Sequence, residues 1–159
     1  MRPLCSEVTV LSIRMALAGA VLALALAAAP AAQARGTATV TKSSGTIRTY
    51  QNVRIRLIGT TSLRVTSADG QGTLSVHHAA CSYIGDLRRC LPFEITLDQH
   101  GAKHLLDLQR GTLYVNVTGG SLQMPHSTML VPAHSIVLSL ETERGTVISV
   151  TGSLDGGAQ

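Results

Sequence analysis

The chain contains no tryptophan, one phenylalanine and three tyrosines in 159 residues. Proteins that bind single-stranded nucleic acid stack bases on aromatic side chains, and this sequence offers few such platforms. A strongly basic charge, the other mark of a nucleic-acid binder, is also missing. Without the leader of 34 residues that is predicted below, which contains Arg2, Arg14 and Glu7, the chain has 11 basic and 8 acidic residues and a net charge of +3. That value favours solubility without marking a polyanion binder, so we expect no nucleic-acid partner.

Cysteine is also scarce, and two of the three, Cys81 and Cys90, close the short stretch CSYIGDLRRC. No C-x-x-C motif is present, which disfavours a redox pair. A two-residue type II′ or I′ turn at Gly85 and Asp86 would place Cys81 opposite Cys90 as a non-hydrogen-bonded antiparallel pair. The Cα atoms of such a pair lie about 4.5 Å apart, within reach of a disulfide. We therefore predict a disulfide between them, the alternative being a metal site with His77 or His78.

Helical periodicity is missing after residue 34, where the dominant period is two. In NVRIRLI, aliphatic side chains alternate with Arg54 and Arg56, and GTLYVNV and SIVLSLET alternate in the same way. About nine such strands at intervals of roughly 8 to 14 residues predict one all-β domain over residues 35–155, a sandwich, jelly roll or short barrel. Residues 156–159 have nothing to bury and are predicted to be a disordered tail.

The dipeptide Gly-Thr occurs six times, at irregular spacing, with its glycine at Gly36, Gly45, Gly59, Gly72, Gly111 and Gly145. A solenoid requires a fixed repeat, so these dipeptides do not indicate one. Glycine takes the positive φ needed to leave a turn, and threonine suits the start of a strand. We interpret all six as turn exits.

The first 34 residues resemble a secretory signal peptide. Arg2 and Arg14 precede fifteen apolar residues, and the run ends near the small-residue site Ala32-Gln33-Ala34. Fifteen residues are fewer than the roughly 20 that cross a bilayer. We therefore expect cleavage before Arg35, no remaining transmembrane anchor, and a periplasmic or secreted location.

Motifs of catalysis and of metal binding are missing. There is no G-x-S-x-G, no phosphate-binding glycine loop and no H-E-x-x-H. The six histidines show no zinc spacing, and adjacent His77 and His78 would point to opposite faces of a regular strand. We expect no enzyme, no cofactor and no resident metal, with His77 and His78 as the weak metal candidates.

Arginine forms the more coherent set. Arg54 and Arg56 share a strand face, and Arg48 and Arg64 would join them if neighbouring strands pair. This candidate anionic-ligand face could hold lipid phosphates, or it could solvate an exposed sheet and discourage edge pairing. Separately, Asn116-Val117-Thr118 matches a glycosylation acceptor in form.

Three stretches, HHAACSYIGDLRRCLPFEITL, KHLLDLQRGTLYVNVT and VPAHSIVLSLETERGTV, resemble small exported β-rich proteins of Gram-negative bacteria that have no assigned function. The resemblance implies export and a β fold, and it carries no catalytic residues. We accordingly expect a non-enzymatic structural or binding module of the cell envelope. The alternatives are a binder of anionic lipid or glycolipid through the arginine face, and a histidine-based metal protein. Envelope lipid and another envelope protein are the partners considered.

Overall fold

The computed structural model describes residues 33–154, and these fold into eleven β-strands. Their bounds are β1 Gln33–Thr41, β2 Ile47–Ile58, β3 Ser62–Thr66, β4 Gly72–Ile84, β5 Leu87–Gln99, β6 Ala102–Leu105, β7 Leu108–Asn116, β8 Leu122–Gln123, β9 Leu130–Val131, β10 Ser135–Thr142 and β11 Val147–Leu154. No helix long and apolar enough to span a bilayer occurs in this part of the chain. The predicted leader up to residue 32 and the predicted tail lie outside the described residues.

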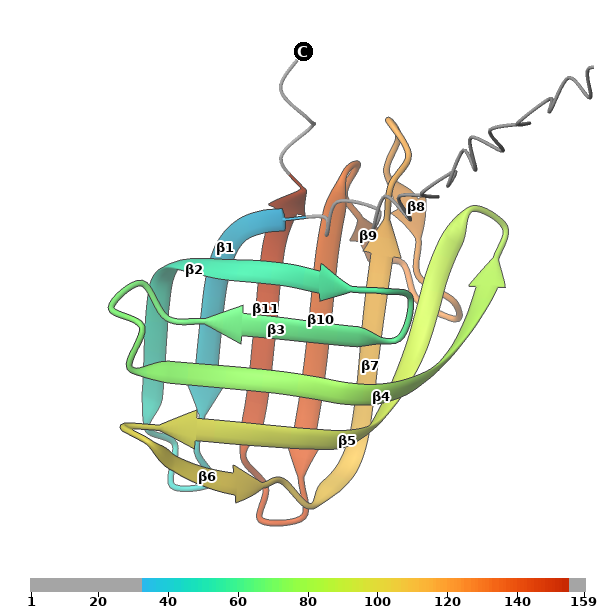
Figure 1. Ribbon diagram of the computed structural model, residues 1–159. Helices are drawn as coiled ribbons and strands as arrows, with labels where there is room; N and C mark the ends of the chain where they lie inside the picture. The colour runs from blue at the N-terminus through green and yellow to red at the C-terminus, as the bar shows by residue number, and fades with distance from the viewer. Residues whose placement is uncertain (1–32, 155–159) are drawn as a thin grey trace, which may run out of the picture.

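One antiparallel sheet closes on itself (Figure 1). The strand order is β4-β3-β2-β1-β11-β10-β7-β5, and β4 pairs with β5 to complete an eight-stranded barrel. Strand β6 extends the sheet beyond β5, and β8 and β9 form a separate two-stranded hairpin. The all-β prediction is confirmed, and of its three alternatives the short barrel is the one that forms.

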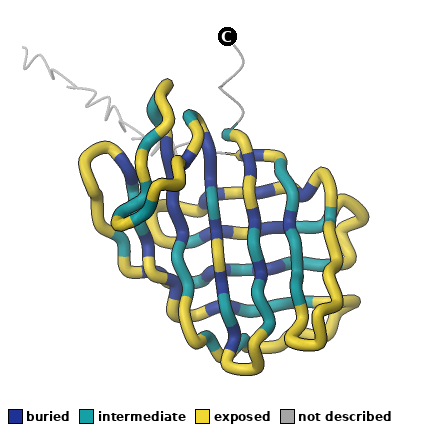
Figure 2. Tube along the Cα trace, turned by 180° about the vertical axis from the view of Figure 1, so that it is seen from behind, coloured by how far each residue is buried: buried dark blue, intermediate teal, exposed yellow. Residues whose placement is uncertain are grey.

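Alternation along the strands produces the barrel core. On β2, Val53, Ile55 and Leu57 are at most 7% exposed, whereas Arg54 and Arg56 point to solvent. The same alternation of buried and exposed positions is visible along the strands in Figure 2. Large aliphatic side chains pack one end of the interior, among them Ile55, Leu63, Leu113, Ile136 and Leu138. Burial of a side chain of this size contributes about 1.5–3 kcal/mol, so this packed end accounts for much of the stability.

The barrel is joined unevenly. Strands β5 and β7 pair through only three residues, Arg88, Arg89 and Cys90, against eight pairs between β7 and β10. Beyond Cys90, β5 leaves β7 while it stays paired with β4, and from Thr96 to Gln99 it pairs with β6 on its other side. The crossing from β6 to β7 is held by backbone hydrogen bonds from Leu106 N to Ile95 O (2.9 Å) and from Glu143 N to Asp107 O (3.0 Å). The wall is therefore complete beside the packed end and looser at the other.

The β4–β5 hairpin has the predicted register. Cys81 pairs with Cys90 and forms the predicted disulfide, and Pro92 lies opposite Ala79 as counted from the turn. Gly85 has φ 58°, while Asp86 has no positive φ, which matches the type II′ alternative. Cys90 also ends the β5–β7 pairing. The disulfide thus joins the hairpin at the point where β5 separates from β7.

Three of the six Gly-Thr glycines occupy turns at positive φ, namely Gly45, Gly59 and Gly145. The interpretation of all six as turn exits is wrong for Gly36 and Gly111, which lie inside β1 and β7. Gly36 is required by close approach, because a Cβ atom there would lie 1.9 Å from the carbonyl oxygen of Thr151 on β11. It allows neighbouring strands to meet at the packed end.

The β8–β9 hairpin is attached to the barrel through a buried asparagine at the end of β7. Asn116 is fully buried, and its Nδ2 donates to the carbonyl oxygens of Gly120 (2.8 Å), Val131 (3.1 Å) and Pro132 (2.8 Å). Its Oδ1 accepts from the backbone and hydroxyl of Thr118. The amide nitrogen is occupied and shielded, so the glycosylation-like triplet is a structural motif in this fold.

Strand β1 begins before the expected cleavage point. Ala34 pairs with Ile55 of β2 and Leu154 of β11, and it is 2% exposed. A cut before Arg35 would remove Gln33 and Ala34 from a strand paired on both sides. The folded domain therefore includes two residues that sequence reasoning assigned to the leader.

Candidate ligand-binding site

The barrel has a hollow of about 710 Å³, open to solvent, at the end opposite the packed one. It lies between the end of β1, the start of β2, the β3–β4 and β10–β11 turns, the end of β5 and residues 104–107. Its inner wall is apolar and includes Val40, Val53, Val65, Leu74, Ile148 and Val150. Eight-stranded barrels are just wide enough to be filled by side chains or to hold one small ligand. In this barrel, side chains fill one end, and the other end has room for a small ligand.

Polar and charged residues surround the opening. The basic residues are Lys42, Arg48 and Arg144, the acidic ones are Asp69, Asp107 and Glu143, and His100 and His104 lie beside them. Lys42 and Arg48 come from the β1–β2 hairpin, whereas Asp107 and Glu143 meet through the backbone bond described above. The rim therefore has a basic side at β1–β2 and a mixed side, with Asp107, Glu143 and Arg144, where residues 106–107 meet the β10–β11 turn. An apolar interior with a polar rim suits an amphipathic molecule.

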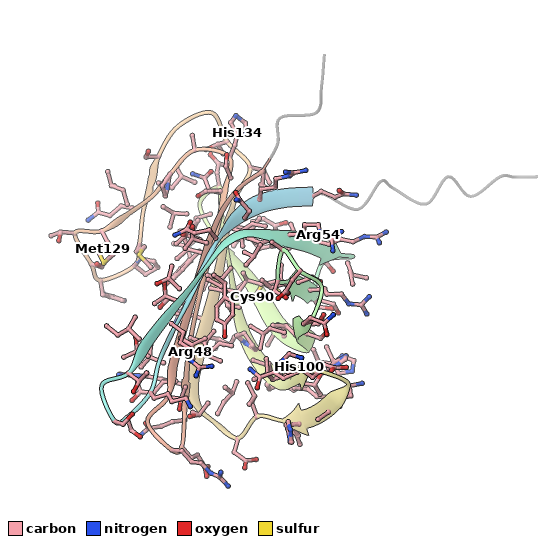
Figure 3. The ribbon with its side chains drawn as sticks, turned by 90° about the vertical axis from the view of Figure 1, so that its left-hand side faces the viewer. Arg48, Arg54, Cys90, His100, Met129 and His134 are labelled. Atoms are coloured by element: carbon pink, nitrogen blue, oxygen red, sulfur yellow. A yellow bond between two sulfur atoms is a disulfide. The ribbon has the colours of Figure 1, made fainter. Side chains whose placement is uncertain are left out.

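Arg48 belongs to this rim because β2 carries a bulge. The β1–β2 register shifts between Gly36 and Ala38, and Asn52 has φ 55°, so the two-residue alternation breaks before Val53. Arg48 and Tyr50 consequently share the inner face with Val53 and both line the hollow. Sequence reasoning grouped Arg48 with Arg54 and Arg56, and the structure places it on the opposite face. Figure 3 shows Arg54 pointing away from the barrel and Arg48 on the side of the hollow.

On the outer face, four exposed arginines lie together on β1, β2 and β3. Arg35 pairs with Arg54, and Arg56 pairs with Arg64. Within residues 33–154, no carboxylate lies within 4.0 Å of any of them. We call Arg35, Arg54, Arg56 and Arg64 the paired-arginine face. It contains three of the four arginines that the sequence suggested, with Arg35 in place of Arg48.

The carboxylate of Asp69 is committed to the β3–β4 turn. Its Oδ1 accepts from the Ser67 hydroxyl (2.6 Å) and from the backbone N–H of Gln71 (3.0 Å). These bonds, with the Ser67 bond as the largest cause, hold the pKa of Asp69 below its ordinary value. Asp69 therefore stays ionised and holds the turn at the rim, which does not suit a general acid.

The histidines do not assemble into a metal site. His77 Nε2 lies 2.8 Å from the Thr96 hydroxyl, and His78 lies 3.5 Å from Glu94 and stacks on Phe93. A register shift around His78 breaks the regular alternation, and both histidines contact β5. No cluster of three or more His, Cys, Asp or Glu side chains suited to a metal occurs among residues 33–154.

Sequence reasoning missed the hollow itself. A usable signal was the size of the inward residues, which falls along β3 towards the hollow and is small throughout β1. On β3, Leu63 faces the packed end and Val65 faces the hollow, while β1 contributes only Ala38 and Val40 there. Recognising the signal requires knowing that these strand ends meet, which depends on the barrel closure.

Comparison of the chain with protein-family models, with curated proteins and with solved structures gave no match.

Proposed function

We propose that this protein is a non-enzymatic binding module that takes one small amphipathic molecule into the hollow of its barrel. The supporting observation is the hollow of about 710 Å³ with an apolar wall and a charged rim. Ligand pockets in proteins range over roughly 300–1,000 Å³, and they combine apolar walls with a few placed polar groups. A purely structural barrel of this size would have its interior filled with side chains, as the packed end has.

The free energy of binding comes from the release of water that fills the hollow in the absence of a ligand. The volume equals that of about two dozen water molecules at the density of the liquid. Part of this water would lie against the partly buried side chains of Val40, Leu97 and Leu106, which offer no hydrogen bonds. An alkyl chain that replaces this water contributes about 0.8 kcal/mol for each buried CH₂ group. A twelve-carbon chain therefore contributes about 9 kcal/mol, and an association cost of about 4 kcal/mol leaves sub-millimolar binding before the head group adds its share.

The rim selects the head group. Arg48 faces the hollow, and no carboxylate within residues 33–154 lies within 4.0 Å of its guanidinium group. Lys42 lies on the same side of the opening. A guanidinium group binds carboxylate and phosphate in a bidentate manner. We infer that the ligand carries an anionic head, which lies at the β1–β2 side while its apolar part enters the barrel.

The compartment suits such a ligand. The predicted leader directs the chain out of the cytoplasm, and a disulfide such as Cys81–Cys90 persists in oxidising compartments. We place the protein in the periplasm or outside the cell, where anionic lipids and their breakdown products are available. The envelope module expected from the sequence thereby becomes a ligand carrier or sensor.

The experiment uses dodecanoate as the probe and isothermal titration calorimetry as the measurement. We expect one site per chain and at least tenfold weaker binding for Val40→Phe, whose added ring enters the hollow. Thr39→Phe is the matched control, because residue 39 precedes Val40 on the same strand and points to the opposite face. Circular dichroism establishes that both variants fold. Equal affinities for the two folded variants would contradict the proposed site.

The head-group inference has its own test. Arg48→Gln should weaken dodecanoate binding about tenfold or more, since a hydrogen bond to a charged group is worth roughly 1.5–3 kcal/mol. Binding of dodecanol, which has the same chain and no charge, should change little. Equal losses for both ligands would show that Arg48 acts on the shape of the hollow and not on the head group.

A further inference from the structure

We propose that the paired-arginine face docks the barrel on an anionic bilayer, with its four guanidinium groups on lipid phosphates. This inference is independent of the hollow, because the two surfaces lie on opposite sides of the β1–β3 wall. It rests on the register of the arginines, on the distribution of charge along the chain and on the closure of the barrel.

The register places like charges directly opposite each other twice, Arg35 against Arg54 and Arg56 against Arg64. Directly opposed like charges destabilise a sheet. No carboxylate among residues 33–154 approaches within 4.0 Å of these groups, so nothing in the described fold offsets the repulsion. An arrangement that works against folding, at four positions on one face, indicates a ligand that supplies the missing negative charge.

Charge is also segregated along the chain. Residues 35–68 contain six basic residues and no acidic one, whereas residues 69–154 contain five basic and seven acidic residues. The excess positive charge of the domain is thus concentrated on the segment that forms β1, β2 and β3, where four of the six basic residues are the paired-arginine face and Lys42 and Arg48 lie at the hollow. Such a distribution orients the whole molecule in front of an anionic surface.

An alternative role for these arginines is to solvate an exposed sheet and to discourage pairing at its edge. Strand β2 pairs with β1 and β3, and β3 pairs with β2 and β4, so neither is an edge in the closed barrel. Closure removes edges, and a strand without an edge needs no charge to prevent edge pairing. Solvation of the wall requires neither arginine in preference to other polar residues nor opposed pairs of like charge.

The spacing fits a surface of many phosphates better than a single one. Opposed side chains lie about 4.5–5.5 Å apart, and Arg54 and Arg56 are about 7 Å apart along β2. The four groups therefore extend over three strands. The outer row of β2 also carries Ile58 and Ile47, which are 42% and 64% exposed at its two ends. Apolar side chains flanking the cationic groups can enter the interfacial layer of a bilayer, which a soluble polyanion does not have.

The test measures cosedimentation with vesicles that contain phosphatidylglycerol. Each basic residue near an anionic bilayer raises binding about fivefold, so four together give roughly several-hundredfold at low salt. Arg54→Gln combined with Arg56→Gln should lower binding about 25-fold, and Arg54→Lys combined with Arg56→Lys should retain most of it. The control is Lys103→Gln combined with Arg110→Gln, which removes the same charge from β6 and β7 and should have little effect.

Binding to anionic vesicles that falls with rising salt and depends on Arg54 and Arg56 supports the proposal. The proposal fails if the wild type does not bind, if the two double variants lose binding equally, or if vesicles of phosphatidylcholine bind as well. It also fails if the arginine variants lose binding to soluble polyphosphate but not to vesicles. Dodecanoate binding should persist in Arg54→Gln with Arg56→Gln, so this outcome is separable from that of the hollow.

Discussion

Replacement of Asn116 by aspartate should destabilise the fold far more than its small change in shape implies. The amide nitrogen faces the carbonyl oxygens of Gly120, Val131 and Pro132 at 2.8–3.1 Å, so its two hydrogens serve three acceptors. In Asn116→Asp, an oxygen without these hydrogens takes that place. Asn116 is 0% exposed, so water does not reach the stranded carbonyl groups in the folded state.

The magnitude follows from the lost donors and from the new charge. A buried group left without its partner costs about 1–3 kcal/mol, and two donors are lost. An uncompensated buried charge costs about 3–5 kcal/mol, which protonation of the carboxyl relieves in part. We expect Asn116→Asp to lower the free energy of unfolding by about 4 kcal/mol or more at pH 7, a large share of the stability of a small domain.

The pH dependence distinguishes this mechanism from loss of packing. Burial and the facing carbonyl oxygens raise the folded-state pKa of Asp at position 116 above its unfolded value of about 3.9. The variant is therefore least destabilised below that value, where the neutral carboxyl donates one hydrogen bond. Its stability falls as the pH rises from the unfolded pKa to the raised folded pKa.

The assay is urea unfolding followed by circular dichroism, because the chain has no tryptophan. Thr118→Val is the milder companion variant, since it removes the one hydroxyl hydrogen that Asn116 Oδ1 (2.7 Å) and the carbonyl oxygen of Gly120 (2.9 Å) share, with an expected loss of about 1 kcal/mol. If Asn116→Asp stays within about 1 kcal/mol of the wild type at pH 7, the attachment of the β8–β9 hairpin does not depend on this network.

Three further predictions concern the wall and the turns. A chain that begins at Arg35 should be about 2 kcal/mol less stable than one that begins at Gln33, because it lacks the buried Ala34 methyl group and its ladder bonds; equal urea midpoints would refute this. Arg56→Glu should stabilise the fold by about 0.5–1 kcal/mol at low salt through its position opposite Arg64, and a lower midpoint would count against the repulsion. Because the folded-state pKa of Asp69 lies below its ordinary value of 3.8, the ionised carboxylate stabilises the fold above that pH. This stabilisation is lost as the pH falls through the lower folded-state pKa. The stability difference between wild type and Asp69→Asn should therefore shrink below pH 4, and a constant difference would exclude the Ser67 bond as its cause.

Local rules were sufficient where contacts are close in sequence. Counting outward from Gly85 gave the Cys81–Cys90 pair and the register as far as Pro92, because an antiparallel hairpin with a two-residue turn has one register. Alternation gave the inner face of β2 from Val53 onward. It failed for Arg48, because the bulge at Asn52 inserts a residue without any strong signal in the sequence.

Features that depend on contacts between distant parts of the chain could not be predicted from the sequence in this way. The closure of the barrel joins β4 to β5 and β5 to β7, and the hollow depends on which strand ends then meet. Asn116 resembled a surface acceptor because its partners come from the later segment around Val131. Each of these features is fixed by contacts between segments whose pairing the pattern of residues does not specify.

The location of a bound ligand can be measured by methyl NMR during titration with dodecanoate. Saturable shifts should occur at Val65, Ile148 and Val150, which line the hollow, and not at Leu63 or Ile136 in the packed end. Shifts confined to exposed apolar residues such as Leu91 and Met129, or no saturable shift at all, would contradict binding inside the barrel.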